Sequence, residues 1–123
     1  MDRQSLLKNK KVLHLTLSKL PFELMVTGEK KIEYRKPNKW ILSRLFEKDS
    51  ITPKEYDLIH FTHGYGSHRP YFICEYWHFI FLHKEKNHYI GLMEYANGLK
   101  FEIEEGDIAI ACGKIVLKGN LKK

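Results

Sequence analysis

The sequence has 123 residues, of which 43% are hydrophobic and 29% are charged, a balance typical of one folded domain. This composition excludes a disordered chain, and because no long apolar run is present we expect neither a transmembrane helix nor a secretory leader. The net charge is +6, and the whole excess lies in residues 1–40, which hold ten basic and four acidic side chains. Such a segment either binds an anionic partner or forms a solvated lysine-rich surface.

The first elements predicted are an arm, a strand and a helix. Residues 1–11 are polar and lysine-rich, which predicts a flexible basic arm. Val12–Leu17 alternates leucine with polar residues, as a half-buried strand does. A helix is expected to begin near Ser18, with proline in its first turn, and to end at Gly28, since glycine readily adopts the positive φ of a helix C-terminus.

The middle of the chain predicts three more strands and a second helix. Lys31–Arg35 alternates as a strand does, and apolar residues at helical spacing predict a helix from Pro37 to about Lys48. Tyr56–Thr62 is expected to be a strand that leads into a glycine-rich polar loop. Tyr71–Leu82 is apolar on both sides, which is expected of a central barrel strand.

The last third predicts strands that are joined by tight turns. Tyr89–Tyr95 and Leu99–Ile103 flank an Asn-Gly pair, which is a strong hairpin signal. A final strand, bulged at Gly113, is expected over residues 108–117, before a polar tail at 118–123. Together the elements predict an α+β fold: a small β-barrel of about six strands with two short helices near the N-terminus, in one domain over residues 12–117.

Cysteine and histidine spacing gives no metal or cofactor motif. Cys74 and Cys112 lie far apart between apolar residues, which predicts two buried free thiols in a reducing, cytoplasmic compartment. His60, His63 and His68 lie close together in sequence but fit no zinc template. We therefore expect no metal, no cofactor and no membrane partner.

The densest group of ionisable residues lies between Gly28 and Arg35. Glu33 and Arg35 share one face of the predicted strand, and Lys30 lies in the turn before it. Lysine and arginine in this pattern can bind a phosphate or a carboxylate, and the glutamate can orient them or act as a base. An exposed ladder of ion pairs explains the same residues without any ligand.

This stretch resembles a known family. Gly28-x-Lys30-x-x-Glu33-x-Arg35 matches the G-x-K-x-x-E-x-R signature of ASCH domains, which belong to the PUA-like superfamily. The similarity covers about residues 12–117, and the chain resembles a small single-domain branch that is common in bacteria and phages. It implies a PUA-type barrel whose cleft, lined by the signature residues, binds RNA or a nucleotide-like anionic ligand.

The same resemblance leaves an enzyme open. One small ASCH protein is a ribonuclease, and another is an amidohydrolase that deacylates modified cytidine with a lysine, a threonine and a glutamate. Lys30 stands at the lysine position, whereas Glu33 stands where that enzyme has its threonine. If the protein is an enzyme, Lys30 and Glu33 are the candidate catalytic residues.

An aromatic and basic loop extends the predicted ligand site. Tyr65 lies between two glycines, which let backbone N–H groups approach a ligand, and it is the best candidate for base stacking. Arg69 and His63 on the same loop, and Lys31 beside the signature, are further candidate ligand contacts. An ordinary hairpin loop is the alternative interpretation.

Two other functions stay open. His14-Leu15-Thr16 and His60-Phe61-Thr62 are both His-x-Thr on predicted strands. Such a pair resembles the two-histidine phosphodiesterases, in which two imidazoles act as general acid and general base on a cyclic phosphate. The third possibility is a protein-interaction module that uses the aromatic strand Tyr71–Leu82.

Overall fold

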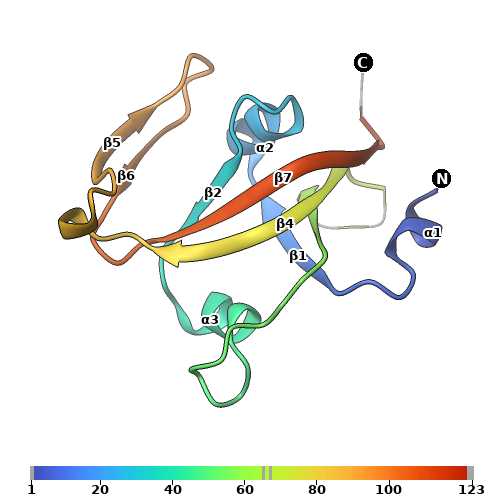
Figure 1. The fold of residues 1–123 in the computed structure, drawn as a ribbon. Coiled ribbons are helices and arrows are strands. Elements are labelled where there is room, and N and C mark those ends of the chain that lie inside the picture. Colours follow the sequence, from blue (N-terminus) through green and yellow to red (C-terminus); the bar gives the residue numbers. More distant parts are fainter. Residues whose placement is uncertain (1, 65, 67, 122–123) are drawn as a thin grey trace. The chain divides into compact units, whose positions relative to one another are not determined.

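The computed structural model describes residues 2–64, 66 and 68–121, and the chain divides into two compact units. Two long strands, β4 (Tyr71–Phe81) and β7 (Ile108–Gly119), are labelled in Figure 1, and the residues of each strand are divided between the two units. The first unit comprises Met1–Lys31, Glu55–Trp77 and Cys112–Lys123, and the second comprises Ile32–Lys54 and His78–Ala111.

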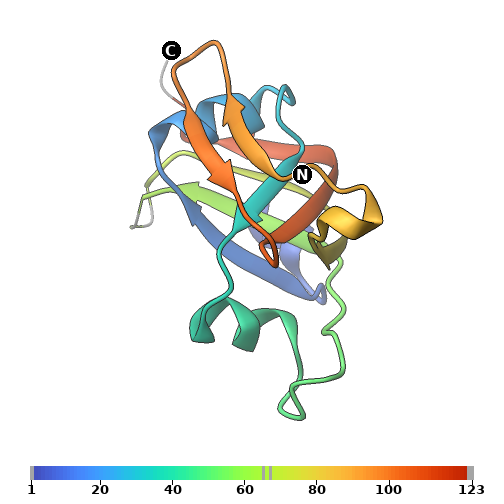
Figure 2. The same ribbon diagram turned by 90° about the vertical axis from the view of Figure 1, so that its left-hand side faces the viewer.

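The first unit is built on four neighbouring strands. Their order is β1 (Val12–Leu17), β3 (Leu58–His63), β4 and β7. β1 and β3 are parallel, whereas β4 runs antiparallel to β3. Helices α1 (Arg3–Leu7) and α2 (Lys19–Val26) belong to the same unit, and α2 is also visible in blue in the turned view (Figure 2).

One face of these strands packs against α2. Phe72 of β4 stacks on Phe61 of β3 with ring centroids 4.8 Å apart, and it meets Phe22 of α2 at 5.4 Å. Burying large apolar side chains in this way is the main favourable contribution to folding. On β1 every second residue is a buried leucine of this face, namely Leu13, Leu15 and Leu17.

The opposite face packs against α1. Leu6 and Leu7 of α1 contact a buried cluster on the strands. The Asp2 carboxylate accepts a hydrogen bond from the backbone N–H of Ser5 at 2.8 Å and so caps the helix. Part of the expected arm at residues 1–11 therefore forms a helix that packs on the sheet. The buried cluster consists of Leu58, Tyr71 and Ile73.

The second unit contains a short helix, a hairpin and the end of the larger sheet. Its β2 pairs antiparallel with residues 108–111 of β7. In the hairpin, the backbone N–H of Tyr95 donates to the carbonyl of Leu99 at 2.9 Å, and Gly98 adopts a φ of +93°, as the Asn-Gly signal predicts. The elements are β2 (Ile32–Arg35), α3 (Lys39–Leu45), η1 (Lys84–Lys86), β5 (Gly91–Glu94) and β6 (Lys100–Ile103).

The predicted α+β class is confirmed. The larger sheet is mixed, with the strand order β1-β3-β4-β7-β2, and β5 pairs with β6 in a separate sheet. The expectation of a strand buried on both sides is correct for only half of β4. Burial is continuous over Tyr71–Cys74, but Trp77 is 62% exposed and Ile80 is 39% exposed.

The α-helices are short. The two that the sequence predicts correspond to α2 and α3, and α1 is an additional one. The longest, α2, has eight residues. Among the described residues, no helix has the length and apolar character that a membrane crossing requires.

Candidate functional site

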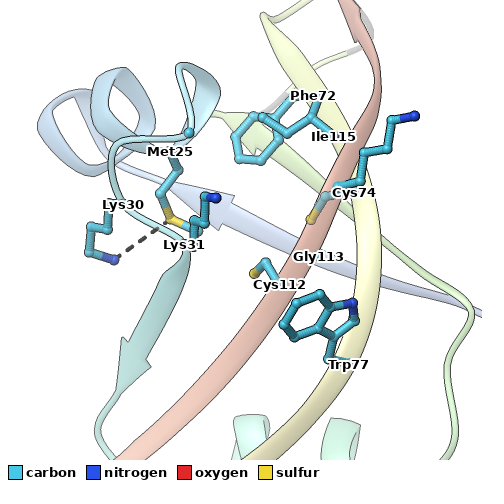
Figure 3. Close-up of a pocket in the computed structure, with 11 residues that line it drawn as sticks. Met25, Lys30, Lys31, Phe72, Cys74, Trp77, Cys112, Gly113 and Ile115 are labelled. Carbon is cyan, nitrogen blue, oxygen red and sulfur yellow. Dashed lines mark hydrogen bonds between the residues drawn. The ribbon is translucent and has the colours of Figure 1, made fainter.

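A pocket of about 310 Å³ lies within the first unit (Figure 3). It is bordered by the end of α2 and the turn that follows, and by the facing parts of β4 and β7. Its lining is largely apolar and sulfur-rich, and it includes Lys30 and Lys31 of the Gly28–Arg35 signature. The lining residues are Met25, Gly28, Lys30, Lys31, Phe72, Cys74, Trp77, Cys112, Gly113, Lys114 and Ile115.

The turn after α2 carries Lys30 back toward the helix. Gly28 has a φ of +86°, a left-handed conformation that glycine adopts without strain. The backbone N–H of Lys30 then donates to the carbonyl of Leu24 at 3.1 Å. The Lys30 side chain is only 4% exposed, and its Nζ lies 3.7 Å from the Met25 Sδ (Figure 3). A lysine this buried is rare, since its charge loses hydration, and it marks the pocket as a candidate anion site.

Lys31 is held at the same pocket by the backbone. Its carbonyl accepts a hydrogen bond from the N–H of Cys112 at 3.1 Å, while its side chain stays exposed. Lys114, on β7, is also exposed, and its N–H donates to the Glu75 Oε1 at 2.9 Å. Of the lining residues named above, three are lysines and none is acidic, so the pocket attracts an anion.

Trp77 supplies an aromatic wall. Its indole lies beside Gly113, where β4 and β7 face each other (Figure 3). A Cβ at residue 113 would overlap the Trp77 Nε1, so only glycine leaves room for this ring position. The indole is 62% exposed and is available for stacking on a flat ligand.

Two thiols form the inner part of the pocket. Cys74 is 1% exposed and Cys112 is 6% exposed, and both are free, which confirms the predicted buried thiols. Hydrogen bonding with Cys112, together with burial, raises the pKa of the Cys74 thiol well above its ordinary value. Cys74 is therefore protonated at neutral pH and is not an activated nucleophile.

Glu33 and Arg35 lie in the second unit, on β2. They share a face of the strand, as the alternation predicts, and the Arg35 Nε lies 2.8 Å from the Glu33 Oε2. Glu33 is only 6% exposed, so this ion pair is largely shielded from water. Of the signature residues, Gly28 and Lys30 line the pocket, whereas Glu33 and Arg35 form an ion pair with each other.

His63 and Arg69, two of the predicted loop contacts, are not among the lining residues named above. The His63 ring stacks on Phe22 with centroids 5.6 Å apart, on the α2 face of the sheet. The space beside Gly64 is filled by the Arg69 guanidinium, and the Arg69 carbonyl accepts a hydrogen bond from the Asn120 side chain at 3.2 Å. Tyr65, the expected stacking residue, lies outside the described residues.

Sequence reasoning missed Trp77 and Lys114. Their nearest sequence signal is Gly113, which lies inside strand β7. Glycine inside a strand also marks the close approach of another group, and here that group is an indole. Gly113 therefore signals in the sequence that an aromatic ring packs against this part of β7.

The chain was compared with protein-family models, curated proteins and solved structures, and none of them matches. Its function is therefore inferred from the geometry and the chemistry of the described residues.

Proposed function

We propose that this protein binds a nucleotide, either free or within an RNA strand, in the pocket at Lys30. The observation that carries the proposal is a lysine only 4% exposed that lines a pocket together with an exposed tryptophan. An aromatic face stacks on a base, and an ammonium group binds a phosphate. Lys31 and Lys114 add positive charge around the same space.

The size of the pocket favours a single nucleotide. Its volume of about 310 Å³ is at the lower end of the range for small-molecule sites, which is roughly 300–1,000 Å³. One base with its sugar and phosphate suits such a space, and neighbouring nucleotides of a strand would stay outside it. Stacking on Trp77 is worth roughly 1–3 kcal/mol by comparison with other single-strand binders.

The ASCH resemblance supports the same proposal. In this interpretation the chain has a PUA-like barrel, and the signature residue Lys30, together with its neighbour Lys31, contacts the ligand. The Glu33 carboxylate is engaged by the Arg35 guanidinium at 2.8 Å. Because of that contact, we assign Glu33 a role in stabilising β2 and not in attacking a substrate. The signature is therefore proposed to bind a ligand and not to hydrolyse it.

A fluorescence titration tests the proposal. The chain has two tryptophans, so Trp40→Phe leaves Trp77 as the only indole. We expect the emission of this variant to change on titration with nucleoside monophosphates or a short single-stranded RNA. Lys30→Met, which keeps an apolar chain of similar length, should weaken binding at least tenfold.

The matched control is Lys48→Ala, which removes the same charge from an exposed position in the second unit. It should bind like the parent protein. Circular dichroism and thermal melting establish that each variant is folded. An unchanged Trp77 signal with every nucleotide, or parent affinity in folded Lys30→Met, would overturn the proposal.

A further inference from the structure

The two His-x-Thr motifs lie side by side in the first unit. β1 and β3 are adjacent parallel strands, and their register pairs His14 with His60 and Thr16 with Thr62. Paired residues of parallel neighbours point to the same face of a sheet, so two imidazoles and two hydroxyls share one face. It is the face that packs against α1, opposite to the face covered by α2.

The two imidazoles are close enough to act on one substrate. The ring centroids of His14 and His60 are 5.2 Å apart, and the rings are tilted by 42°. His60 also stacks on Tyr71 of β4 with centroids 5.2 Å apart and an interplanar angle of 10°. Tyr71 therefore fixes the plane of one imidazole, while its neighbour His14 is exposed to solvent.

Arg3 brings a permanent positive charge to the pair. Its guanidinium lies 4.1 Å above the centre of the Tyr71 ring, and its Nη1 lies 3.4 Å from the His60 Nε2. Arginine can only donate, so the His60 Nε2 is the acceptor in this contact and carries no proton. The same guanidinium suits the planar pair of oxygens of a phosphate group.

His60 is poised as the neutral member of the pair. Burial, followed by the charges of His14 and Arg3, lowers the pKa of His60 to about 4. The groups that face it are His14 of β1, Arg3 of α1 and Tyr71 of β4. At neutral pH His60 is therefore not an imidazolium, and its neutral ring can accept a proton as a general base does.

We propose that His14, His60, Thr16 and Thr62 form a second site, which hydrolyses a cyclic phosphodiester such as a nucleoside 2′,3′-cyclic phosphate. Arg3 binds the phosphate oxygens when it leaves the His60 Nε2. The two threonine hydroxyls, both half-buried, donate to the same phosphate group. This inference uses no residue of the Lys30 pocket.

The reaction needs only water as its co-reactant. The oxygen of water forms a bond to phosphorus while His60 accepts the proton that this water loses. The bond from phosphorus to one ribose oxygen breaks, and protonated His14 gives its proton to that oxygen. The products are a phosphomonoester and a free hydroxyl, and proton exchange with solvent restores the pair.

To test this site, the protein is incubated with 2′,3′-cyclic AMP and the products are separated by chromatography. We expect conversion to adenosine monophosphate, and a fall of about 100-fold or more in His14→Ala and in His60→Gln, as for general acid–base residues elsewhere. His78→Ala removes an exposed histidine of β4 and should hydrolyse the compound like the parent protein. Arg3→Ala should raise KM more than it lowers kcat.

The Lys30→Met variant separates this inference from the proposed function. It should lose nucleotide binding in the pocket and keep hydrolysis of 2′,3′-cyclic AMP. The inference is overturned if the parent protein leaves the compound intact, or if folded His14→Ala hydrolyses it at the parent rate. Because His14 is exposed, its substitution should leave the melting temperature nearly unchanged, so loss of activity in His14→Ala has a chemical cause.

Discussion

The Trp77 indole occupies the space that a side chain at residue 113 would need. An ideal Cβ at Gly113 would overlap the Trp77 Nε1, and it would lie only 2.7 Å from the Glu75 Oε1. Glycine at this position therefore sets where the aromatic wall of the pocket stands. The glycine at residue 113 thus helps to shape the pocket.

Gly113→Ala should displace Trp77. Crowding of this kind costs roughly 1–3 kcal/mol of unfolding free energy, and nucleotide binding should weaken because the stacking surface moves. Urea denaturation and Trp77 fluorescence in the Trp40→Phe background measure the two effects. Val116→Ala, on the exposed side of β7, should change neither. Normal stability and binding in Gly113→Ala would contradict this prediction, because the indole would then accommodate a side chain at residue 113 without a cost.

Salt should weaken RNA binding at the pocket. Phosphate contacts release condensed counterions, and each contact contributes about −0.7 to the slope of log K against log salt concentration for single strands. Lys114→Ala removes one exposed cation of the pocket and should make the slope less steep by about that amount. Lys48→Ala should leave the slope as it is. Binding that does not respond to salt would contradict a phosphate contact.

Asp107 should be a strong stability determinant of the second unit. Its buried carboxylate accepts hydrogen bonds from the Lys36 Nζ at 2.6 Å and from the Glu104 N–H at 2.8 Å. Asp107→Ala removes the acceptor of both hydrogen bonds and should cost about 1–3 kcal/mol of unfolding free energy. Glu104→Ala removes only an exposed partner of Lys36 and should cost less than about 1 kcal/mol. Equal losses in the two variants would contradict this difference.

The contact between Lys36 and Asp107 also predicts a loss of stability at alkaline pH. The hydrogen bond that the Lys36 Nζ donates to Asp107, followed by the one it donates to Glu104, raises the pKa of Lys36 above the ordinary 10.5. The native state therefore holds this proton more tightly than the unfolded chain does. The contribution is complete below about pH 10.5 and disappears as the pH rises through the higher native pKa. Chemical denaturation between pH 9 and 12 should show a smaller alkaline loss in Lys36→Met.

The lowered pKa of His60 predicts that the protein also loses stability at acidic pH. Its pKa falls from an ordinary 6.5 to about 4 in the folded protein, first because it is buried. Between these two values the unfolded chain binds a proton that the native protein does not, so the unfolding free energy should decrease as the pH falls from about 6.5 to about 4. Denaturation curves of the parent and of His60→Gln give the difference. Parallel pH dependences would contradict a neutral buried imidazole.

Alternation in the sequence was enough to predict most strands and their faces. Leu13 and Leu15 point to the core and His14 away from it, as the period of two requires. The Glu33–Arg35 contact follows from the same rule. Local patterns do not specify which strands become neighbours, so the register of β1 with β3, and hence the pairing of His14 with His60, required the structure.

The errors have physical reasons. The aromatic residues of β4 predict burial on both sides of the strand, but Trp77 is exposed to solvent and lines the pocket. The helix at residues 3–7 was missed because its apolar residues are few, and it is stabilised by packing on the strands and by the Asp2 cap. Short helices gain most of their stability from tertiary contacts, which a local pattern does not contain.

The parallel pairing of β1 with β3 sets an order of assembly. Parallel strands need a long crossover, and here α2, β2 and α3 lie between them in the sequence. Loop-closure entropy opposes such distant contacts early in folding, so the His14–His60 face forms late, after local elements such as the β5–β6 hairpin. During synthesis the two imidazoles come together only once β3 has left the ribosome.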